Sequence, residues 1–494
     1  MVVNLWTVPL LLQVLGHSDY GLYQLIAGVV SMLAFINASM TVSTQRYMSV
    51  TLGERNLQKL GIIYNTSIAL HIIIGLAIVV ILEILTPFLL GGFLNIPPGR
   101  EKATVWIYQF MIISTFFNIA VVPFDAVLNA YENMIVFAII SIIEVVCKLV
   151  LVFLLPLFNM DLLILYGGGW ALITILGALA KYIYTRFKYP FLTPQRNQVN
   201  KESITEMMSF AGWNVYGALA SVTRNQGIAI LLNKFFGAII NASYGIANQI
   251  NGLVSYFTAT LQKSINPQLM QSLGAKDNER MLKLAFLSSK YSTLIVIMLN
   301  IPMIIEMPYI LTLWLQKIPE YTIPFARLTL IIPIISQMTA GIVSAIQANG
   351  MIKQYQAIIG SILILNIPFS ILALYLWKNP IVVYLVMITI ECVCLIGRIL
   401  FAIKLVNLDW KAFCKKIIIP LIAIIGICGL CIGEVAIHTD ASLFIVIIEY
   451  IVNALLIGTF SWIMLLSKEE KNYFTNLLYT ISQKNKKGHC HENK

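Results

Sequence analysis

Hydrophobic stretches of roughly 20 residues alternate with short polar connections along almost the whole chain. As α-helices, stretches of that length cross the ~30 Å hydrocarbon core of a bilayer. The pattern predicts an all-α polytopic membrane protein with about 14 transmembrane helices. The predicted spans begin at residues 1, 21, 61, 103, 133, 161, 207, 242, 284, 322, 355, 379, 417 and 443. The first is short, so we expect it to be tilted or to lack part of a natural start before Met1.

The composition leaves little room for anything outside the membrane. Hydrophobic residues make up 59% of the chain and charged residues 11%, which is far from the balance of a soluble globular protein. The seven cysteines lie in apolar or cytoplasmic stretches and do not indicate a disulfide framework. Three adjacent residues, His489, Cys490 and His491, favour a solvated tail end over a metal site. Neither a metal nor another cofactor is expected.

The distribution of basic residues predicts the orientation. Most of the 33 Lys and Arg residues fall in the connections after even-numbered spans and in the C-terminal tail. Because basic residues in short loops resist translocation, we expect both termini on the cytoplasmic side of a bacterial inner membrane. The net charge of +11 is then a topology signal, and no nucleic-acid binding is expected.

A weak internal repeat divides the chain. Leu52-Gly53 matches Leu273-Gly274, and Pro87 matches Pro308 at the same spacing. Each copy has an even number of spans, so both enter the membrane in the same direction. The expected fold is therefore two parallel six-helix bundles around a central cavity, plus two extra C-terminal helices. Chance similarity between apolar helices remains the alternative.

The predicted organisation has five parts. They are an N-terminal bundle at 1–185, a cytoplasmic linker at 186–206, a C-terminal bundle at 207–404, additional helices 13 and 14 at 405–466, and a basic cytoplasmic tail at 467–494. In the tail, Phe474, Leu477, Leu478 and Ile481 alternate with basic residues and predict a helix lying on the membrane surface. Asp19 is expected to cap the second span, with Gly21 permitting a tight entry.

Several short motifs resemble those of one transporter family. They are the stretch from Leu15 to Tyr23, the stretch from Ser43 to Ser49, and Pro123-Phe124-Asp125 leading to Asn129-Ala130-Tyr131-Glu132. In this order, the motifs resemble bacterial polysaccharide (O-antigen type) flippases of the multidrug/oligosaccharidyl-lipid/polysaccharide exporter superfamily. The resemblance implies a transporter rather than an enzyme. It also implies that the substrate is an undecaprenyl-pyrophosphate-linked oligosaccharide, and that the partners are membrane lipids and other membrane proteins of polysaccharide assembly.

Basic residues inside spans are candidate substrate ligands, because an ionisable group at bilayer depth usually faces a cavity or a partner. The guanidinium of Arg224 suits a pyrophosphate, although a structural ion pair is an equal alternative. Arg46 is either a cytoplasmic anchor or a phosphate ligand, and Lys290 either snorkels or faces the cavity. Lys148 lies four residues after Glu144, so mutual neutralisation is the alternative to substrate binding. The candidate substrate-binding residues are Arg224, Arg46, Lys290, Lys148, Asn225 and Gln249.

Two acidic residues are candidates for carrying a coupling ion. Asp125 and Glu391 are the acids that we expect to be buried, and a buried carboxylate with a raised pKa could carry a coupling proton. Hydrogen bonding to a neighbouring helix is the ordinary alternative. Pro87, Pro123, Pro302, Pro308, Pro333 and Pro368 fall in or next to spans and predict bends.

Two competing functions remain open. A multidrug or cation antiporter of the same superfamily would need acidic groups in its cavity. A membrane-embedded glycan polymerase or ligase would need a large outer loop or clustered acids or histidines, and neither is evident here. The charge of the cavity is the feature that separates a flippase from an antiporter.

Overall fold

All regular elements in the described part of the chain are helices. The computed structural model describes residues 2–31, 34–93, 96–195, 198–315, 317–439, 442–473 and 475–476. The tail residues Phe474, Leu477, Leu478, Ile481, His489, Cys490 and His491 lie outside these ranges, so the expected surface helix and the tail cluster are not described. The chain divides into two compact units, which are treated separately below.

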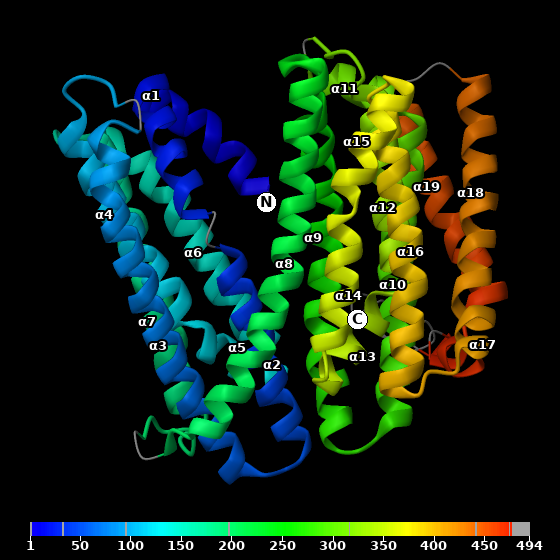
Figure 1. The fold of residues 1–494 in the computed structure, drawn as a ribbon, viewed down its shortest axis with the longest axis horizontal. Helices are drawn as coiled ribbons and strands as arrows, with labels where there is room; N and C mark the ends of the chain where they lie inside the picture. Colours follow the sequence, from blue (N-terminus) through cyan, green and yellow to red (C-terminus); the bar gives the residue numbers. More distant parts are fainter. Residues whose placement is uncertain are drawn as a thin grey trace, which may run out of the picture. The chain divides into compact units, whose positions relative to one another are not determined.

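The first unit contains Met1–Ser221, Lys263–Met281 and Gln347–Gly360. Its complete helices are α1 (Val2–Ser31), α2 (Ala34–Gly53), α3 (Leu57–Phe88), α4 (Glu101–Ala120), α5 (Val122–Ala130), α6 (Met134–Leu154) and α7 (Leu162–Lys188). Helix α4 packs against both α3 and α7 (Figure 1). The unit also holds the first part of α8 (Lys201–Phe236), as far as Ser221, and the last part of α9 (Ala238–Gly274).

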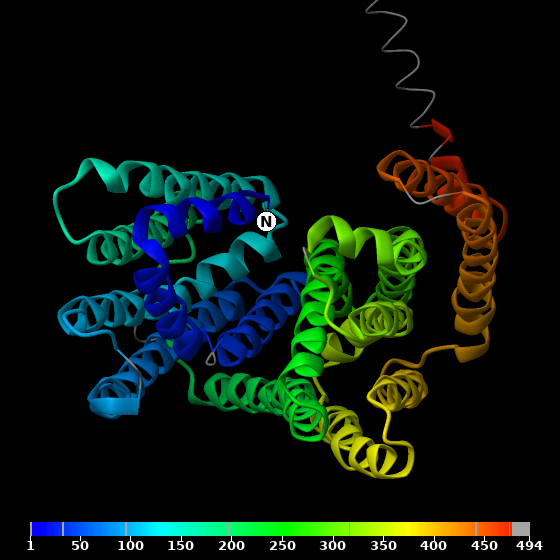
Figure 2. The ribbon, with the colours of Figure 1, turned by 90° about the horizontal axis from the view of Figure 1, so that it is seen from above.

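The second unit contains Val222–Gln262, Leu282–Ile346 and Ser361–Lys494. Its further helices are α10 (Asn278–Ile305), α11 (Met307–Trp314), α12 (Thr322–Gln337), α13 (Ala340–Asn349), α14 (Lys353–Ile364), α15 (Asn366–Trp377), α16 (Ile381–Val406), α17 (Trp410–Phe413), α18 (Ile419–His438) and α19 (Leu443–Phe460). Helices α12 and α15 both pack on α16, and α18 lies beside α19 (Figures 1 and 2). Helices α10, α13 and α14 each contribute residues to both units.

The predicted spans fall on helices throughout the described residues. Nine of these helices are long and apolar enough to cross a membrane, and the bent pair α12 and α13 would make a tenth. The remaining predicted spans fall on α1, α2, α8 and α9. Helices α8 and α9 have 36 and 37 residues, so each is longer than the ~30 Å core at about 1.5 Å per residue. The all-helical, two-bundle fold expected from the sequence is confirmed.

Prolines lie where spans are interrupted, as predicted. The span of α4 and α5 breaks at Val121, two residues before Pro123. Helices α10 and α11 are separated at Glu306, two residues before Pro308. Pro333 lies inside α12, and the axis turns by 48° between α12 and α13. A proline removes one backbone donor and crowds the preceding turn, so the helix is weakened at these places.

The internal repeat is visible as a reciprocal contact between the ends of α2 and α9. A Cβ on Gly53 would lie 2.1 Å from the carbonyl oxygen of Gln271, and a Cβ on Gly274 would lie 2.0 Å from that of Val50. Gly53 and Gly274 are separated by the same number of residues as Val50 and Gln271. In each copy, the glycine therefore leaves room for close contact with the backbone of the other copy.

The turns that follow these glycines also match. Arg55 and Lys276 occupy the left-handed region, with φ of 56° and 60°. Asn56 Oδ1 then accepts a hydrogen bond from Lys59 N, and Asp277 Oδ1 accepts one from Arg280 N, each at 2.9 Å. Equal backbone and capping geometry at equal spacing favours duplication over chance similarity.

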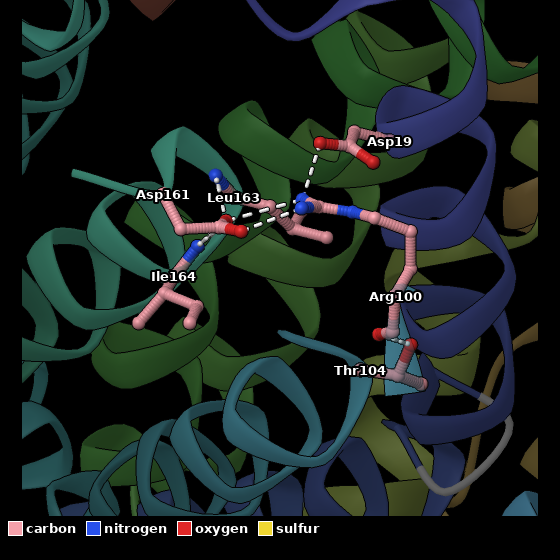
Figure 3. A network of polar contacts seen from close by, with 6 residues as sticks. All are labelled: Asp19, Arg100, Thr104, Asp161, Leu163 and Ile164. Carbon is pink, nitrogen blue, oxygen red and sulfur yellow. Dashed lines mark hydrogen bonds and ion pairs between the residues drawn. The ribbon is translucent and has the colours of Figure 1, made fainter. Parts of the chain in front are cut away.

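The start of the second span differs from the expectation. The tight bend within α1 lies at Gly16, with φ of 78°, not at Gly21. The carboxylate of Asp19 accepts a hydrogen bond from Arg100 at 2.5 Å, and no capping bond to it is formed among the described residues. Arg100 also binds Asp161 through both Nη atoms, at 2.5 and 3.1 Å, so one guanidinium holds two acids from different helices (Figure 3).

Asp161 has a second role as the N-cap of α7. Its Oδ1 accepts hydrogen bonds from the backbone N–H groups of Leu163 and Ile164 at 3.1 and 3.2 Å (Figure 3). Burial raises the pKa of the Asp161 carboxyl, but the hydrogen bonds and charge of Arg100 and the two backbone donors outweigh it, so the pKa lies below its usual value. This network fixes the end of the first unit at which α4 and α7 begin.

Candidate functional site

A polar cavity lies inside the first unit, among α1, α2, α3, α4, α5 and α7. It has a volume of about 390 Å³. A second hollow of about 210 Å³ shares Val30, Thr115 and Asn118 with it, and the two together are called the N-terminal chamber. Polar groups on its wall include Tyr23, Asn37, Thr41, Thr115, Asn118, Asp125, Trp170 and Lys181. Hydrogen-bonding groups set among apolar helices are typical of a small-molecule site.

One ion pair dominates the charge of the N-terminal chamber. Lys181 Nζ, on α7, lies 3.1 Å from Asp125 Oδ1, on α5. The same ammonium lies 4.0 Å from Glu144 Oε1, on α6. The side chains of Lys181 and Asp125 are 9% and 18% exposed. Three helices therefore bring two carboxylates to one ammonium at bilayer depth, where each charge needs a partner.

Glu144 and Lys148 make no direct ion pair in the described residues, although the charge of each acts on the other. The ion pair of Glu144 is with Lys181 instead. Lys148 Nζ lies 4.0 Å from the centroid of the Trp170 ring, close enough for a cation–π contact. Trp170 lines the N-terminal chamber, so Lys148 approaches the chamber through this ring.

A second buried charge cluster lies in the second unit, and we call it the arginine cluster. Arg224 Nη1 is 3.6 Å from Glu391 Oε2, and Arg398 Nη2 is 2.8 Å from Glu391 Oε1. Their side chains are 15%, 4% and 11% exposed for Arg224, Glu391 and Arg398. Two arginines thus share one carboxylate. The structural ion pair that was the alternative for Arg224 is present.

The two polar candidates near Arg224 differ in their contacts. Asn225 Oδ1 accepts a hydrogen bond from Arg224 Nε at 3.2 Å, and its backbone carbonyl accepts one from Tyr244 at 3.1 Å. Gln249 is exposed on α9, and in the described residues no hydrogen bond joins it to the arginine cluster. The structure therefore brings Arg224, Asn225 and Glu391 together, and leaves Gln249 apart.

Arg46 is buried against the end of α13. Its guanidinium donates at 3.0, 3.0 and 3.2 Å to three consecutive backbone carbonyls, those of Gln347, Ala348 and Asn349. Carbonyls at a helix C-terminus lack partners in the helix and attract positive charge. The ring of Phe210 lies 5.0 Å from the guanidinium carbon. A phosphate at Arg46 would have to displace these carbonyls.

Lys290 binds the segment that follows the last span. Its Nζ lies 2.8 Å from both carboxylate oxygens of Glu470. Ser467 and Glu470 form a capping box, because each side chain accepts a hydrogen bond from the other's backbone N–H. Burial raises the pKa of Glu470, but the hydrogen bond from Lys290, the capping bonds and the charge of Lys290 hold it below its usual value. Lys290 is therefore bound to the segment after the last span and does not line the N-terminal chamber.

Three partners were not identified from the sequence. Lys181 and Arg398 were grouped with the cytoplasmic basic residues, and Glu470 with the tail. Lys181 lies seven residues before the end of α7 at Lys188, about 10 Å inside the helix at 1.5 Å per residue. This depth could have indicated that Lys181 is buried. It was missed because the end of the predicted span was uncertain by several residues.

A family model and several solved structures resemble this chain. The family model described as MatE matches residues 2–154. No curated protein sequence is similar enough to the chain to match it. A crystal structure of MATE in complex with MaD3S is 12% identical, with a TM-score of 0.71, and covers 82% of this chain and 92% of its own. An outward-facing multidrug resistance MATE family transporter is 13% identical, with a TM-score of 0.66, and covers 82% and 95%.

One further solved structure is described by its pocket. It is a MOP superfamily transporter from Pyrococcus furiosus, whose binding pocket has reverse polarity that suggests a different function. It is 12% identical, with a TM-score of 0.66, and covers 84% of this chain and 96% of its own. At these identities the likeness shows the fold. This chain folds as MATE transporters of the MOP superfamily do.

Proposed function

We propose that this chain is a secondary transporter that exports small amphiphilic organic molecules of the multidrug type by alternating access. The observation that carries the proposal is the N-terminal chamber, whose larger part has a volume of about 390 Å³. Ligand pockets for drug-sized molecules occupy roughly 300–1,000 Å³. The fold is one that solved MATE transporters share, and it supports rocking of one bundle against the other.

The charge of the N-terminal chamber supports the same proposal. The sequence led us to expect a cavity dominated by Arg224, which would suit a pyrophosphate. Arg224 is instead paired with Glu391 in the second unit, and the acid Asp125 lines the N-terminal chamber. Lys181 lines the same wall and balances this charge, so the chamber offers the acid that an antiporter needs without the excess positive charge that a pyrophosphate would require. The multidrug alternative therefore fits better than the flipping of a lipid-linked oligosaccharide.

Asp125 is the group that we assign to coupling. Its partner Lys181 is held at 3.1 Å and lies within 4.0 Å of a second acid, Glu144. A proton or a cationic substrate that binds to Asp125 would release Lys181 to Glu144. Exchange of one ammonium between two carboxylates is a two-state arrangement that substrate and ion can bias in opposite directions.

Transport in vesicles tests the proposal. The full chain is reconstituted with an imposed proton or sodium gradient, and uptake of a fluorescent organic cation is measured. We expect gradient-dependent uptake that Asp125→Asn abolishes, while Glu434→Gln, an exposed acid on α18, transports as the native chain does. Absence of uptake for a broad set of amphiphilic cations and anions, with the lipid-linked substrate moved instead, would overturn it.

Flipping of an undecaprenyl-pyrophosphate-linked oligosaccharide is the second candidate, and the arginine cluster favours it. Arg224 and Arg398 both contact Glu391, and two neighbouring guanidiniums offer the fork of donors that suits a diphosphate. A labelled lipid-linked oligosaccharide in the same vesicles tests this candidate. If the candidate is correct, labelled lipid appears in the opposite leaflet with the native chain and does not appear there with Arg224→Gln. Label that stays in its original leaflet eliminates it.

A further inference from the structure

Two buried acids, neither of them part of the N-terminal chamber or the arginine cluster, lie near the interface at which the last span packs on α10. Glu449, on α19, is fully buried at 0% exposure. Glu306, in the break between α10 and α11, is 7% exposed. Its side chain makes no capping hydrogen bond to α11, and its charge acts on Glu449. Both residues belong to the second unit.

Nothing in the described chain satisfies the Glu449 carboxylate. Neither of its oxygens has a hydrogen-bond partner there, and no ion pair to Glu449 is formed among the described residues. An isolated ionised carboxylate in a dry interior is costly, so such groups are paired, hydrogen-bonded or neutralised. Glu449 has no partner that could do this.

A third oxygen without a partner lies one helical turn away on α19. Asn453 is fully buried at 0% exposure. Its Nδ2 donates to the backbone carbonyls of Ile297 and Met298 on α10, at 3.3 and 3.1 Å. These bonds fix the orientation of the amide, and its Oδ1 has no partner in the described residues. Residues four apart share one helix face, so Glu449 faces α10 as Asn453 does.

The register of the two helices brings the acids to the same region. Asn453 bonds at the level of residues 297 and 298, and Tyr450 donates from its hydroxyl to Leu299 O at 3.2 Å. Glu306 follows Leu299 by about two helical turns, at the end of α10. Each turn is about 5.4 Å long. Glu449 stands one turn from Asn453 in the same direction along the interface.

The neighbouring cations are engaged elsewhere. The guanidinium of Arg327, on α12, donates to the backbone carbonyls of Ile304 and Ile305 at 2.8 and 2.9 Å. On α18, which packs beside α19, Glu434 is exposed and lies 3.9 Å from His438. The interface thus presents two carboxylates and one amide oxygen, and no donor of the described residues reaches Glu449 or Asn453 Oδ1.

We propose that Glu449, Glu306 and Asn453 form a binding site for one monovalent cation, either a proton or Na⁺. Oxygen ligands suit a hard cation such as Na⁺. A proton shared by the two carboxylates would serve equally, because Asn453 Oδ1 can accept the resulting O–H donor. The site lies on α19, one of the two helices outside the duplicated bundles. It therefore makes the attachment of this helix to α10 dependent on the bound cation.

Thermal unfolding of the purified full chain tests the site in two titrations. In the first, NaCl replaces choline chloride at about pH 8.5, where free carboxylates are ionised. In the second, the pH is raised from about 5 to about 9 without Na⁺. The variant Glu449→Gln keeps the shape of the side chain and removes its charge. Glu434→Gln, an exposed acid on the adjacent helix, is the matched control.

A sodium site predicts that Na⁺ raises the melting temperature of the native chain and of the control by several degrees, and leaves Glu449→Gln unchanged. A proton site predicts that the native chain and the control lose stability as the pH rises, and that Glu449→Gln loses less. If Glu449→Gln follows the native chain in both titrations, the proposal is overturned. If this variant cannot be purified, Glu306→Gln is measured in the same two titrations. A melting temperature that depends less on Na⁺ or on pH than that of the native chain supports the site, and an unchanged dependence overturns it.

Discussion

Gly53 has no room for a side chain, and neither does Gly274. Each packs on a backbone carbonyl of the other's helix at a distance that any Cβ would violate. We predict that Gly53→Ala or Gly274→Ala destabilises the first unit by roughly 1–3 kcal/mol, the usual cost of overpacking. Thermal unfolding in detergent measures this loss.

Gly426 on α18 is the matched control for the glycine variants. A Cβ there would meet nothing within 4 Å. Alanine favours a helix interior over glycine by up to about 1 kcal/mol. We therefore expect Gly426→Ala to be neutral or slightly stabilising. An equal loss of stability in all three variants would mean that the contact between α2 and α9 has no special role.

The carboxylate of Glu391 is the counter-ion of two buried guanidiniums. Removing one member of a buried ion pair costs about 3–5 kcal/mol, because it leaves an unpaired charge. We predict that Glu391→Gln lowers the melting temperature strongly, and that adding Arg224→Gln to it recovers part of the loss. A double variant no more stable than Glu391→Gln alone would show that Arg224 does not depend on Glu391.

Burial was expected for the acids Asp125 and Glu391, and Glu391 is buried, but the partners of both acids were not identified. Asp125 and Lys181 lie on α5 and α7, and pairing between helices depends on how those helices pack. Hydrophobic periodicity does not report this packing. Glu144 shows the same dependence: the charge of Lys148 on its own helix acts on it, but its ion pair is with Lys181 on the next helix.

At the scale of elements, the segment after the last span is fastened by one buried ion pair. We predict that Glu470→Gln frees this segment, because it removes the counter-ion of Lys290 while Gln preserves the capping box. Trypsin cleavage at Lys468 and Lys471 should become roughly tenfold faster or more. Glu469→Gln is the control, since its pair with Lys283 is exposed and contributes little. Equal cleavage of both variants would contradict the prediction.

The pH dependence of this contact has a defined direction. The pKa of Glu470 is held below its usual value, so the ionised form is the one that the folded state stabilises. The contribution is complete above the ordinary value of about 4.3 and is lost as the pH falls through the lower folded pKa. We predict acid-induced release of the segment in the native chain and in Glu469→Gln. In Glu470→Gln the segment should already be free at neutral pH, so a native-like acid transition in this variant would contradict the assignment.

Element positions were largely predictable from the sequence. Apolar stretches of membrane-spanning length form helices, because lipid offers no hydrogen-bond partners for free backbone N–H and C=O groups. Bends were predicted at prolines, and breaks are observed next to Pro123 and Pro308. The tight bend in the first helix was misplaced to Gly21. Any glycine can adopt the left-handed region, and only the packing of α1 selects Gly16.

At the scale of the whole molecule, the duplication was visible in a handful of matched residues and the function was not. Both bundles follow from hydropathy and constant spacing. The size and charge of the N-terminal chamber arise from side chains on six helices, which no linear pattern reports. This difference separates a fold that was predicted correctly from a substrate that was assigned on resemblance.

The reciprocal glycine contact also limits how the two copies of the gene segment can diverge. A bulkier residue at Gly53 would displace the end of α9. This displacement would also disturb the contact of Gly274 with the backbone of α2. Mutations at the two positions are thus expected to be coupled, each tolerated only with a compensating shift in the other copy. Sequence drift elsewhere in the halves can proceed independently, which accounts for a repeat that survives at these turns and has faded along the spans.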